Sequence, residues 1–340
     1  MTVVAVVVPF YQSSIGILTR ALESVRRQET SNFSVRIIVV DDASPLALEE
    51  ELATTGFKPD GRWDVVKQDN GGPGAARNTA LQRLTDDPPD FVAFLDSDDE
   101  WVPNHLARAL GVMADGVDFY GADHQRLGEE GGTFYQIRQE TGEILHRLGE
   151  RRTVDDTAVF DLAGSKAIQA FVGSYLVQTS TVVYRWSALS DVRFDVSLRA
   201  AGEDHLFWLD SAALARRCSI DLSLGSRCLD GVNIYENAVS WDDPATVRRA
   251  FYLLLLWSKA RVRFARDGQA ARAINARLKN HRRFFAYLWL RALARRKEAN
   301  IGLLRNLMRT DRIAVPRLAA ALCGLAVDRW STGAFGFIEH

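Results

Sequence analysis

Four groups of polar residues have the types and spacing to carry chemistry, and the most acidic is Asp96-Ser97-Asp98-Asp99. It follows the apolar run Phe91–Leu95, which predicts a strand. Hard divalent ions such as Mg²⁺ or Mn²⁺ take oxygen ligands and bridge carboxylates to phosphates, so crowded carboxylates at a strand end indicate a metal site. The alternative is an acidic turn that caps a helix beginning near Pro103.

The second group is the glycine-rich segment from Asn70 to Asn78, which contains Gly74 and Arg77. Arg77 stands where a dinucleotide fingerprint has its third glycine, and the segment follows the third predicted strand, which argues against a nicotinamide or flavin site. A glycine-rich turn into a helix presents backbone N–H groups to phosphate, and Arg77 adds positive charge. A plain turn with a surface arginine is the alternative.

Two weaker groups remain. Asp41 and Asp42 end another predicted strand, where they would either accept hydrogen bonds from a nucleoside or cap the next helix. Tyr11 would either stack on a base or pack at the sheet edge. In Gly202-Glu203-Asp204-His205, partial burial would raise the pKa of a carboxyl group towards that of a general base, with helix capping by Asp204 as the alternative. We interpret His205 as a bystander.

The elements that must position these groups alternate between strand and helix. Apolar residues at helical spacing over 17–25 and a stretch ending at Leu84 predict helices between the first strands. This alternation predicts an open α/β sheet, which binds ligands beyond the carboxyl ends of its strands. The predicted strands are Val3–Val8, ended by Pro9, then Val35–Val40, Trp63–Lys67, Phe91–Leu95 and Thr181–Tyr184.

The rest of the chain is less regular. Residues 121–165 are rich in Gly, Glu and Arg and predict a long excursion over a site. A helix is predicted at Glu203–Leu214, and the chain becomes helical and basic after about Asp243. No GxxxxGK[ST], HExxH or GxSxG motif occurs, which argues against P-loop, zincin and serine-hydrolase chemistry.

Composition narrows the class of protein further. With 47% hydrophobic and 25% charged residues the chain can bury a core, and its three cysteines indicate a reducing, intracellular setting. We expect neither a secretory signal nor a membrane span, because no apolar run approaches roughly 18 to 20 residues. Residues 246–340 hold 20 Lys and Arg against 5 Asp and Glu, whereas residues 1–245 hold 22 against 38. Opposite charges indicate two parts with different roles.

Taken in order, the motifs resemble those of family-2 glycosyltransferases with the GT-A fold, over roughly residues 3 to 245. The Pro-Phe-Tyr-Gln variant of the first motif is similar to bacterial exopolysaccharide glucosyltransferases of the succinoglycan type. The resemblance implies a mostly parallel sheet flanked by helices in a catalytic domain over 1–245, followed by a basic helical region over 246–340. The motifs are Val8-Pro9-Phe10-Tyr11-Gln12, Val39-Val40-Asp41-Asp42-Ala43-Ser44, Gly72-Pro73-Gly74-Ala75-Ala76-Arg77-Asn78, Asp96-Ser97-Asp98-Asp99 and Gly202-Glu203-Asp204.

The resemblance also implies a role for each matching residue. Tyr11 and Asp42 would hold the uracil of a UDP-sugar with Asp41 nearby, and Arg77 would fix the nucleotide side of the pocket. Asp96 would contact ribose or metal, Asp98 would coordinate Mg²⁺ or Mn²⁺, and Asp99 would share that task. Asp204 would deprotonate the acceptor hydroxyl, so that the anomeric carbon is inverted. Pro9, Gly74 and Ser97 complete the expected donor-binding set.

Three departures from the family pattern shape the expected activity. Phe10 replaces a small polar residue and Gln12 replaces an asparagine, which leaves the ribose contacts open. Arg329-Trp330 lacks the preceding Gln of the processive synthases, so we expect a non-processive enzyme. The expected reaction moves a hexose, with glucose favoured, from a UDP-sugar to a lipid-linked saccharide. A non-catalytic sugar-nucleotide-binding scaffold and a nucleotidyltransferase that releases pyrophosphate are the alternatives.

The basic end of the chain predicts a further partner. Arginines recur among aromatic and aliphatic residues, as in His281–Arg296, a pattern that suits the surface of an anionic bilayer. Docking on the acidic part and binding to nucleic acid are the alternatives, and no nucleic-acid module is present. We therefore expect a cytoplasmic protein peripheral to the inner face of the cell membrane.

Overall fold

The computed structural model describes residues 1–58, 63–126, 132–199, 201–228, 244–295, 301–311 and 316–324. The chain divides into two compact units. The first, here called the α/β unit, comprises Met1–Val196 and Phe207–Asn233. The second, here called the helical unit, comprises Ser197–Leu206 and Ile234–His340. The expected division at residue 245 stays a prediction.

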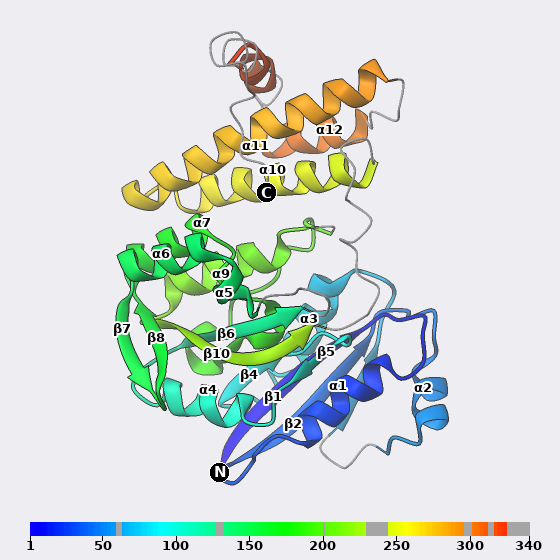
Figure 1. Cartoon of the computed structure of the whole chain (residues 1–340). Helices are drawn as coiled ribbons and strands as arrows, with labels where there is room; N and C mark the ends of the chain where they lie inside the picture. Colours follow the sequence, from blue (N-terminus) through cyan, green and yellow to red (C-terminus); the bar gives the residue numbers. More distant parts are fainter. Residues whose placement is uncertain are drawn as a thin grey trace. The chain divides into compact units, whose positions relative to one another are not determined.

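The α/β unit is built on one sheet with the strand order β3-β2-β1-β4-β9-β6-β10-β8-β7, and β5 pairs with β10 (Figure 1). The sheet is open and flanked by helices, which confirms the expected α/β fold. The expectation that the sheet is mostly parallel is wrong, because five of the nine strand pairs among the described residues are antiparallel. The strands are β1 Thr2–Phe10, β2 Phe33–Asp41, β3 Trp63–Lys67, β4 Phe91–Phe94, β5 Asp99–Trp101, β6 Phe119–Arg126, β7 Glu150–Val154, β8 Thr157–Leu162, β9 Val183–Arg185 and β10 Cys218–Cys228.

The first four strands in this order run parallel, so their carboxyl ends share one edge of the sheet. The predicted end of the first strand at Val8 is wrong, because β1 continues through Pro9 to Phe10. Its partner β2 extends equally far, and the Asp42 N–H donates to the Phe10 carbonyl at 3.0 Å. Beyond β4 the directions mix, since β9 runs antiparallel to both β4 and β6.

Helices cover both faces of the sheet, which explains why Val4–Val8 is fully buried. Apolar residues of α1 such as Leu18 and Leu22 pack into this core and are fully buried. The helices are α1 Ile17–Arg26, α2 Leu48–Thr55, α3 Pro73–Arg83, α4 His105–Met113, α5 Phe134–Ile137, α6 Gln139–Leu148, α7 Gly164–Gly173, η1 Thr179–Thr181, α8 Trp186–Leu189 and α9 Glu203–Leu214.

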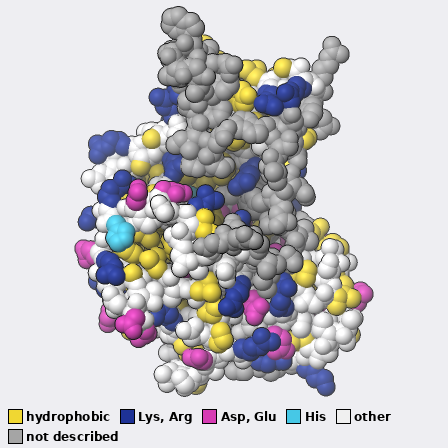
Figure 2. Space-filling view, in the orientation of Figure 1, with side chains coloured by type: hydrophobic (Ala, Val, Ile, Leu, Met, Phe, Trp, Pro, Cys, Tyr) yellow, Lys and Arg dark blue, Asp and Glu magenta, His cyan; other side chains and the backbone are white. Residues whose placement is uncertain are grey.

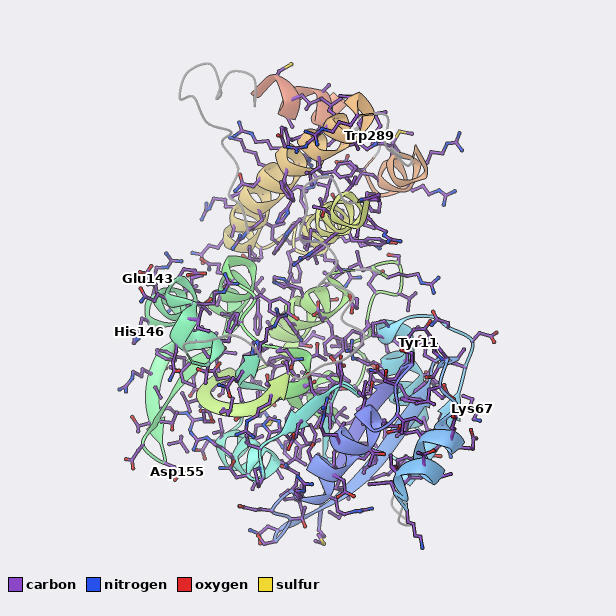
Figure 3. All side chains as sticks on the ribbon, turned by 45° about the vertical axis from the view of Figure 1, so that its right-hand side comes forward. Tyr11, Lys67, Glu143, His146, Asp155 and Trp289 are labelled. Carbon is purple, nitrogen blue, oxygen red and sulfur yellow. The ribbon has the colours of Figure 1, made fainter. Side chains whose placement is uncertain are left out.

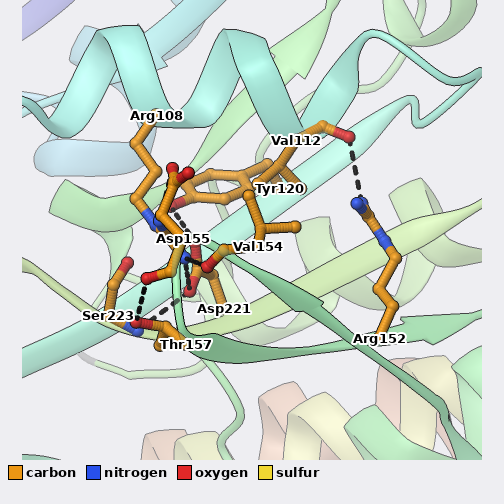
Figure 4. A network of polar contacts seen from close by, with 9 residues as sticks. All are labelled: Arg108, Val112, Tyr120, Arg152, Val154, Asp155, Thr157, Asp221 and Ser223. Atoms are coloured by element: carbon orange, nitrogen blue, oxygen red, sulfur yellow. Dashed lines mark hydrogen bonds and ion pairs between the residues drawn. The ribbon is translucent and has the colours of Figure 1, made fainter.

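The prediction of a long excursion over 121–165 is wrong, because β6, α5, α6, β7 and β8 occupy the described part of this region. Its hairpin turns at Asp155 and Asp156, both at positive φ, which suits a tight two-residue turn. Arg108 of α4 fastens the hairpin, donating to Asp221 at 2.7 Å and to the Val154 carbonyl at 3.0 Å (Figure 4). Tyr120 donates to the same carboxylate. The Arg108–Asp221 ion pair therefore anchors the Val154 end of a hairpin whose first strand, β7, has little apolar pattern.

The helical unit contains α10 Pro244–Arg263, α11 Gly268–Ala294 and α12 Ile301–Thr310, which agrees with the helical character predicted after Asp243 for the residues that the structure describes there. Asp267 caps α11 by accepting from the Gln269 and Ala270 N–H groups. No helix in the described ranges is both long and apolar enough to cross a bilayer. Arg329-Trp330 lies outside the described residues. On the face shown in Figure 2, acidic and basic side chains are interspersed over the α/β unit.

Candidate active site

Three of the predicted motifs meet at the carboxyl edge of the parallel strands. Tyr11 follows β1, Asp41 ends β2, and the Asp96–Asp99 turn follows β4, and β1 lies between β2 and β4. Tyr11 has 44% of its surface exposed and lies on the same side of the molecule as Lys67, the last residue of β3 (Figure 3). An aromatic ring is therefore available to solvent at the edge where ligands of such sheets bind.

Asp42 holds the glycine-rich loop. Its Oδ1 accepts from Gln68 Nε2 at 2.7 Å and from the Gly71 N–H at 2.8 Å, and its Oδ2 accepts from the Gly72 N–H at 2.8 Å. Gly72 has a φ of 87°, which favours glycine, and Pro73 then begins α3. Asp42 is 3% exposed, so its carboxylate serves mainly to shape the loop that precedes α3.

α3 brings Arg77 to the acidic turn. Its Nη2 donates to Asp96 Oδ1 at 2.5 Å, and its guanidinium carbon lies 5.2 Å from the centre of the Phe194 ring. Arg77 is 3% exposed, and Gly74 is buried on the same helix. The helix thus delivers one buried positive charge to one of the three carboxylates.

A chain of hydrogen bonds connects the Asp41 motif to the acidic turn. The Ser44 N–H donates to Asp41 Oδ1 at 2.9 Å, and the Gln12 N–H donates to Ser44 Oγ at 2.9 Å. Gln12 Nε2 then donates to Ser97 Oγ at 3.1 Å. With the Asp42 loop and Arg77 this closes a circuit through all four motifs of the edge. Sequence reasoning gave neither Ser44 nor Gln68 a role, although Ser44 belongs to the second motif, because their contacts depend on the packing of separate loops.

The Asp96–Asp99 turn concentrates negative charge. The Asp99 N–H donates to the Asp96 carbonyl at 3.0 Å, which closes the turn. Burial, and then the charge of Asp96, raise the pKa of Asp98 to about 6. Burial and the neighbouring carboxylates raise the pKa of Asp99 to about 8. The shifts show that burial and mutual repulsion make the charged forms of these two carboxyl groups costly.

The residues present fit a hard divalent cation, because two incompletely buried carboxylates, Asp96 and Asp98, lie on one tight turn. Within the described ranges, no three side chains of the kinds that ligate metals converge on one point. An ion here would therefore take part of its coordination from a bound molecule, for which diphosphate oxygens are suited.

The fifth motif, Gly202-Glu203-Asp204, lies in the helical unit and is not part of this circuit. Asp204 stands in the first turn of α9, where the helix dipole favours an anion, and its Oδ1 accepts from the His205 N–H at 2.6 Å. Gly202 has a φ of 88°, and a Cβ there would lie 3.1 Å from Leu256. The His205 ring packs edge-on against Trp257 with centroids 5.2 Å apart. Helix α10 thus supports the segment that carries Asp204.

Residues 5–172 match the model of the family described as Glycosyl transferase family 2. The chain belongs to this family, and it is a glycosyltransferase. It is 31% identical over 331 residues to the succinoglycan biosynthesis protein ExoW of Rhizobium meliloti (strain 1021), an alignment that covers 97% of this chain and 100% of that relative.

Solved structures give the same fold. A crystal structure of Staphylococcus aureus TarS 1–349 in complex with UDP-GlcNAc matches 100% of this chain and 94% of that one, with a TM-score of 0.62 at 18% identity. The mannosyltransferase PcManGT from Pyrobaculum calidifontis, in complex with GDP-Man and Mn²⁺, matches 97% of this chain and 87% of that one, with a TM-score of 0.55 at 18% identity. At this identity the likeness supports the GT-A fold alone.

Proposed function

We propose that the protein is an inverting, metal-dependent, non-processive hexosyltransferase that uses a UDP-sugar, with glucose as the favoured hexose. The observation that carries this proposal is the circuit of hydrogen bonds that joins the Asp41 motif, the Asp42 loop, Arg77 and the acidic turn at one sheet edge. Such a circuit fixes the relative positions of groups that bind a base, a ribose and a diphosphate, and rigid placement is what donor recognition requires.

Each end of the circuit has a part in donor binding. The exposed Tyr11 ring stacks on the uracil, and Asp42 with the loop that it shapes borders the base, with Asp41 nearby. Pro9 and Gly74 complete the walls, and Arg77 keeps Asp96 in place on the ribose side. Ser97 fixes the turn through Gln12. The hydrogen bonds hold these groups in place before the donor arrives, so less ordering is needed on binding.

Asp96 and Asp98 would hold Mg²⁺ or Mn²⁺ together with the diphosphate of the donor. When bound, such an ion offsets the charge that develops on the leaving UDP. Asp204 takes the proton of the acceptor hydroxyl, and that oxygen attacks the anomeric carbon from the side opposite UDP, which inverts its configuration. For Asp99 the contacts favour a different role, which is developed in the next subsection.

We further propose a saccharide acceptor linked to a polyprenyl diphosphate, in exopolysaccharide synthesis. Support comes from the similarity to ExoW, whose name assigns it to succinoglycan biosynthesis. A water-soluble donor and a lipid-linked acceptor require the enzyme to work at a membrane surface, on its cytoplasmic side where nucleotide sugars are made.

The decisive experiment measures release of UDP or GDP from a panel of nucleotide sugars with Mn²⁺. It compares wild type with Asp98→Ala and Asp204→Asn, and Asp87→Asn serves as control because its side chain is 83% exposed. Without acceptor, we expect slow hydrolysis of one UDP-sugar, and this hydrolysis should require the metal and Asp98. With acceptor, UDP release should be faster and should also require Asp204. Full activity of Asp204→Asn with acceptor would remove Asp204 as the base.

The two alternatives give different results in the same assay. A scaffold would bind UDP in a calorimetric titration and release no nucleotide from any donor, with or without acceptor. A nucleotidyltransferase would release pyrophosphate from a nucleoside triphosphate and a sugar phosphate. Asp98→Ala alone does not separate the enzymes, because both would use its carboxylate, so the identity of the released product decides.

The helical unit is proposed as the membrane-facing part. Exposed apolar residues alternate there with exposed basic ones, an arrangement that suits a bilayer interface. On α11 these are Leu290, Leu293 and Arg295, and on α12 they are Arg305, Met308 and Arg309.

Sedimentation with vesicles containing phosphatidylglycerol tests this. The double change Arg305→Glu with Arg309→Glu should weaken binding at least tenfold, since each basic residue near an anionic surface contributes about 1 kcal/mol. The matched double change Arg26→Glu with Arg27→Glu, in the α/β unit, should leave binding unaltered. Equal binding by all three proteins would remove the membrane proposal.

A further inference from the structure

One hydroxyl group contacts both ends of the acidic turn. Ser180 Oγ accepts from the Asp96 N–H at 2.9 Å and donates to Asp99 Oδ2 at 2.5 Å. Ser180 belongs to η1, more than eighty residues further along the chain, and it is fully buried. The first and last residues of the turn are therefore held at a fixed separation by a third, distant residue.

Gln178 reinforces this contact from the residue before η1. Its Nε2 donates to Asp99 Oδ2 at 2.6 Å, and its Oε1 accepts from the Ser180 N–H at 2.7 Å. The Trp101 indole N–H donates to the Ser180 carbonyl at 2.5 Å. Ser180 is thus fixed by its own backbone on both sides, and its hydroxyl has little freedom to release the turn.

Asp99 differs from its two acidic neighbours in these contacts. Its Oδ2 receives two donors from within the protein, and the residue is 4% exposed. Across the β5–β10 pair it faces Cys228, where burial, followed by the charge of Asp99, raises the pKa of the thiol. Asp96 and Asp98 are less buried than Asp99, although Arg77 already engages one oxygen of Asp96.

Holding the turn matters because its carboxylates repel one another. Like charges on adjacent residues favour a splayed conformation, in which the oxygens would not point at a common ion. A hydrogen bond to the Asp96 N–H and another to the Asp99 carboxylate oppose this spreading at both ends. Groups that orient ligands without touching the metal commonly alter affinity 10- to 100-fold.

We propose that Asp99, Ser180 and Gln178 are positioning residues, which set the geometry of the turn so that Asp96 and Asp98 meet the ion, and that Asp99 is not itself a ligand. This inference rests on the proposed function, in which the turn binds Mg²⁺ or Mn²⁺ with the donor. The sequence predicts three carboxylate ligands, and this inference reduces them to two, Asp96 and Asp98.

The test is Mn²⁺ binding to the full-length protein in the presence of UDP, followed by the electron paramagnetic resonance signal of free Mn²⁺. Ser180→Ala should weaken Mn²⁺ binding about tenfold and leave UDP binding without metal unchanged. Asp99→Asn keeps an acceptor for both donors, so its Mn²⁺ affinity should stay within about threefold of wild type. Asp98→Asn should lose more than a hundredfold.

Ser219→Ala is the matched control. Ser219 is fully buried and donates to Asp161 Oδ1 at 2.5 Å at the other end of β10 from Cys228. Ser219→Ala loses the same kind of hydrogen bond as Ser180→Ala. Both variants should therefore have a lower melting temperature than wild type, whereas only Ser180→Ala should bind Mn²⁺ more weakly. If Ser180→Ala fails to fold, Gln178→Met replaces it in the Mn²⁺-binding assay. This variant removes one hydrogen-bond donor to Asp99 and keeps the Ser180 hydroxyl.

Three results would count against the proposal. Equal Mn²⁺ affinity of Ser180→Ala and Ser219→Ala would overturn the positioning role while leaving the metal site intact. A loss in Asp99→Asn as large as in Asp98→Asn would make Asp99 a ligand. No UDP-dependent Mn²⁺ binding by wild type would overturn this inference and the metal dependence of the proposed function together.

Discussion

Two sets of carboxylates lie at the same sheet edge, after β2 and after β4, and the protein treats them differently. Asp42 receives three donors, two of them backbone N–H groups of the adjoining loop. The Asp96–Asp99 turn brings three carboxylates together, and burial and mutual repulsion raise the pKa of both Asp98 and Asp99. Asp42 is satisfied by the polypeptide, whereas the carboxylates of the acidic turn repel one another despite the donors that Asp96 and Asp99 receive.

This difference separates architecture from ligand binding. A buried carboxylate surrounded by donors is already stabilised as an anion, so it can shape a loop at no further cost. A crowded carboxylate is costly until a cation arrives, and proteins keep such groups where binding compensates for the cost. Stability should therefore rise when a carboxylate of the acidic turn is neutralised and fall when Asp42 is neutralised.

The largest effect is expected from Asp98→Asn. Turnover of the UDP-sugar should fall at least about a thousandfold because a metal ligand is lost. The metal-free protein should instead melt about a few degrees higher at pH 7. A pKa raised to about 6 means that the folded state holds the proton more tightly than the unfolded state, so the charged form costs stability above that pH. A melting temperature of Asp98→Asn below that of wild type would contradict the difference between the two sets of carboxylates.

Asp42→Asn should instead lower the stability of the protein. An amide places an NH₂ group against the donors of Gln68, Gly71 or Gly72, which leaves buried N–H groups without an acceptor. We expect a loss of about 1–3 kcal/mol in the free energy of unfolding, measured by urea denaturation. UDP affinity should drop about tenfold through the altered loop. Asp87→Asn, on the surface, controls for the loss of one charge.

The pH dependence of metal binding should separate the two sets further. Mn²⁺ competes with the proton on Asp98, so its affinity should fall as the pH drops below about 6, approaching about tenfold for each pH unit. The pH dependence is measured by calorimetric titration of the protein and Mn²⁺ with a UDP-sugar between pH 5 and 8. The diphosphate of a UDP-sugar does not change its protonation in this range. The slope of Mn²⁺ affinity against pH should become flatter in Asp98→Asn and should keep its wild-type value in Ser44→Ala. An unchanged slope in Asp98→Asn would assign the proton elsewhere.

The smallest effect is expected from Ser44→Ala, which cuts the chain of hydrogen bonds between the two sets. Ser44 Oγ donates to the Gln12 carbonyl and accepts from the Gln12 N–H, both at 2.9 Å. Its loss should cost about 1 kcal/mol of stability and lower UDP-sugar affinity about threefold, by calorimetry. A change larger than that of Asp42→Asn would mean that the link between the sets matters more than either set.

Much of the donor half could be read from the sequence, because its strands are continuous apolar runs. Trp63–Lys67 and Glu203–Leu214 match the structure at both ends, and the polar groups that follow the strands do share one edge. The five motifs, taken in their order along the chain, also indicated the family. These features depend on local pattern and on the simple geometry of parallel strands.

The remaining contacts are non-local. The hairpin of β7 and β8 was missed, because Glu150-Arg151-Arg152 shows no apolar alternation and its anchor is the ion pair between Arg108 and Asp221. Gln178 and Ser180 looked like ordinary loop residues. They reach the acidic turn because β9 pairs antiparallel with β4 across about ninety residues of chain, which no local pattern encodes.

The late position of β9 and β10 in the chain has a consequence for biosynthesis. Asp96 leaves the ribosome long before Ser180, and β5, which begins at Asp99, gains its partner only when Cys228 has emerged. Until then the nascent polypeptide lacks the two hydrogen bonds that Ser180 makes to the acidic turn. Closing such long loops is slow relative to local folding. The contacts that fix both ends of the turn are therefore among the last to form as the chain is made.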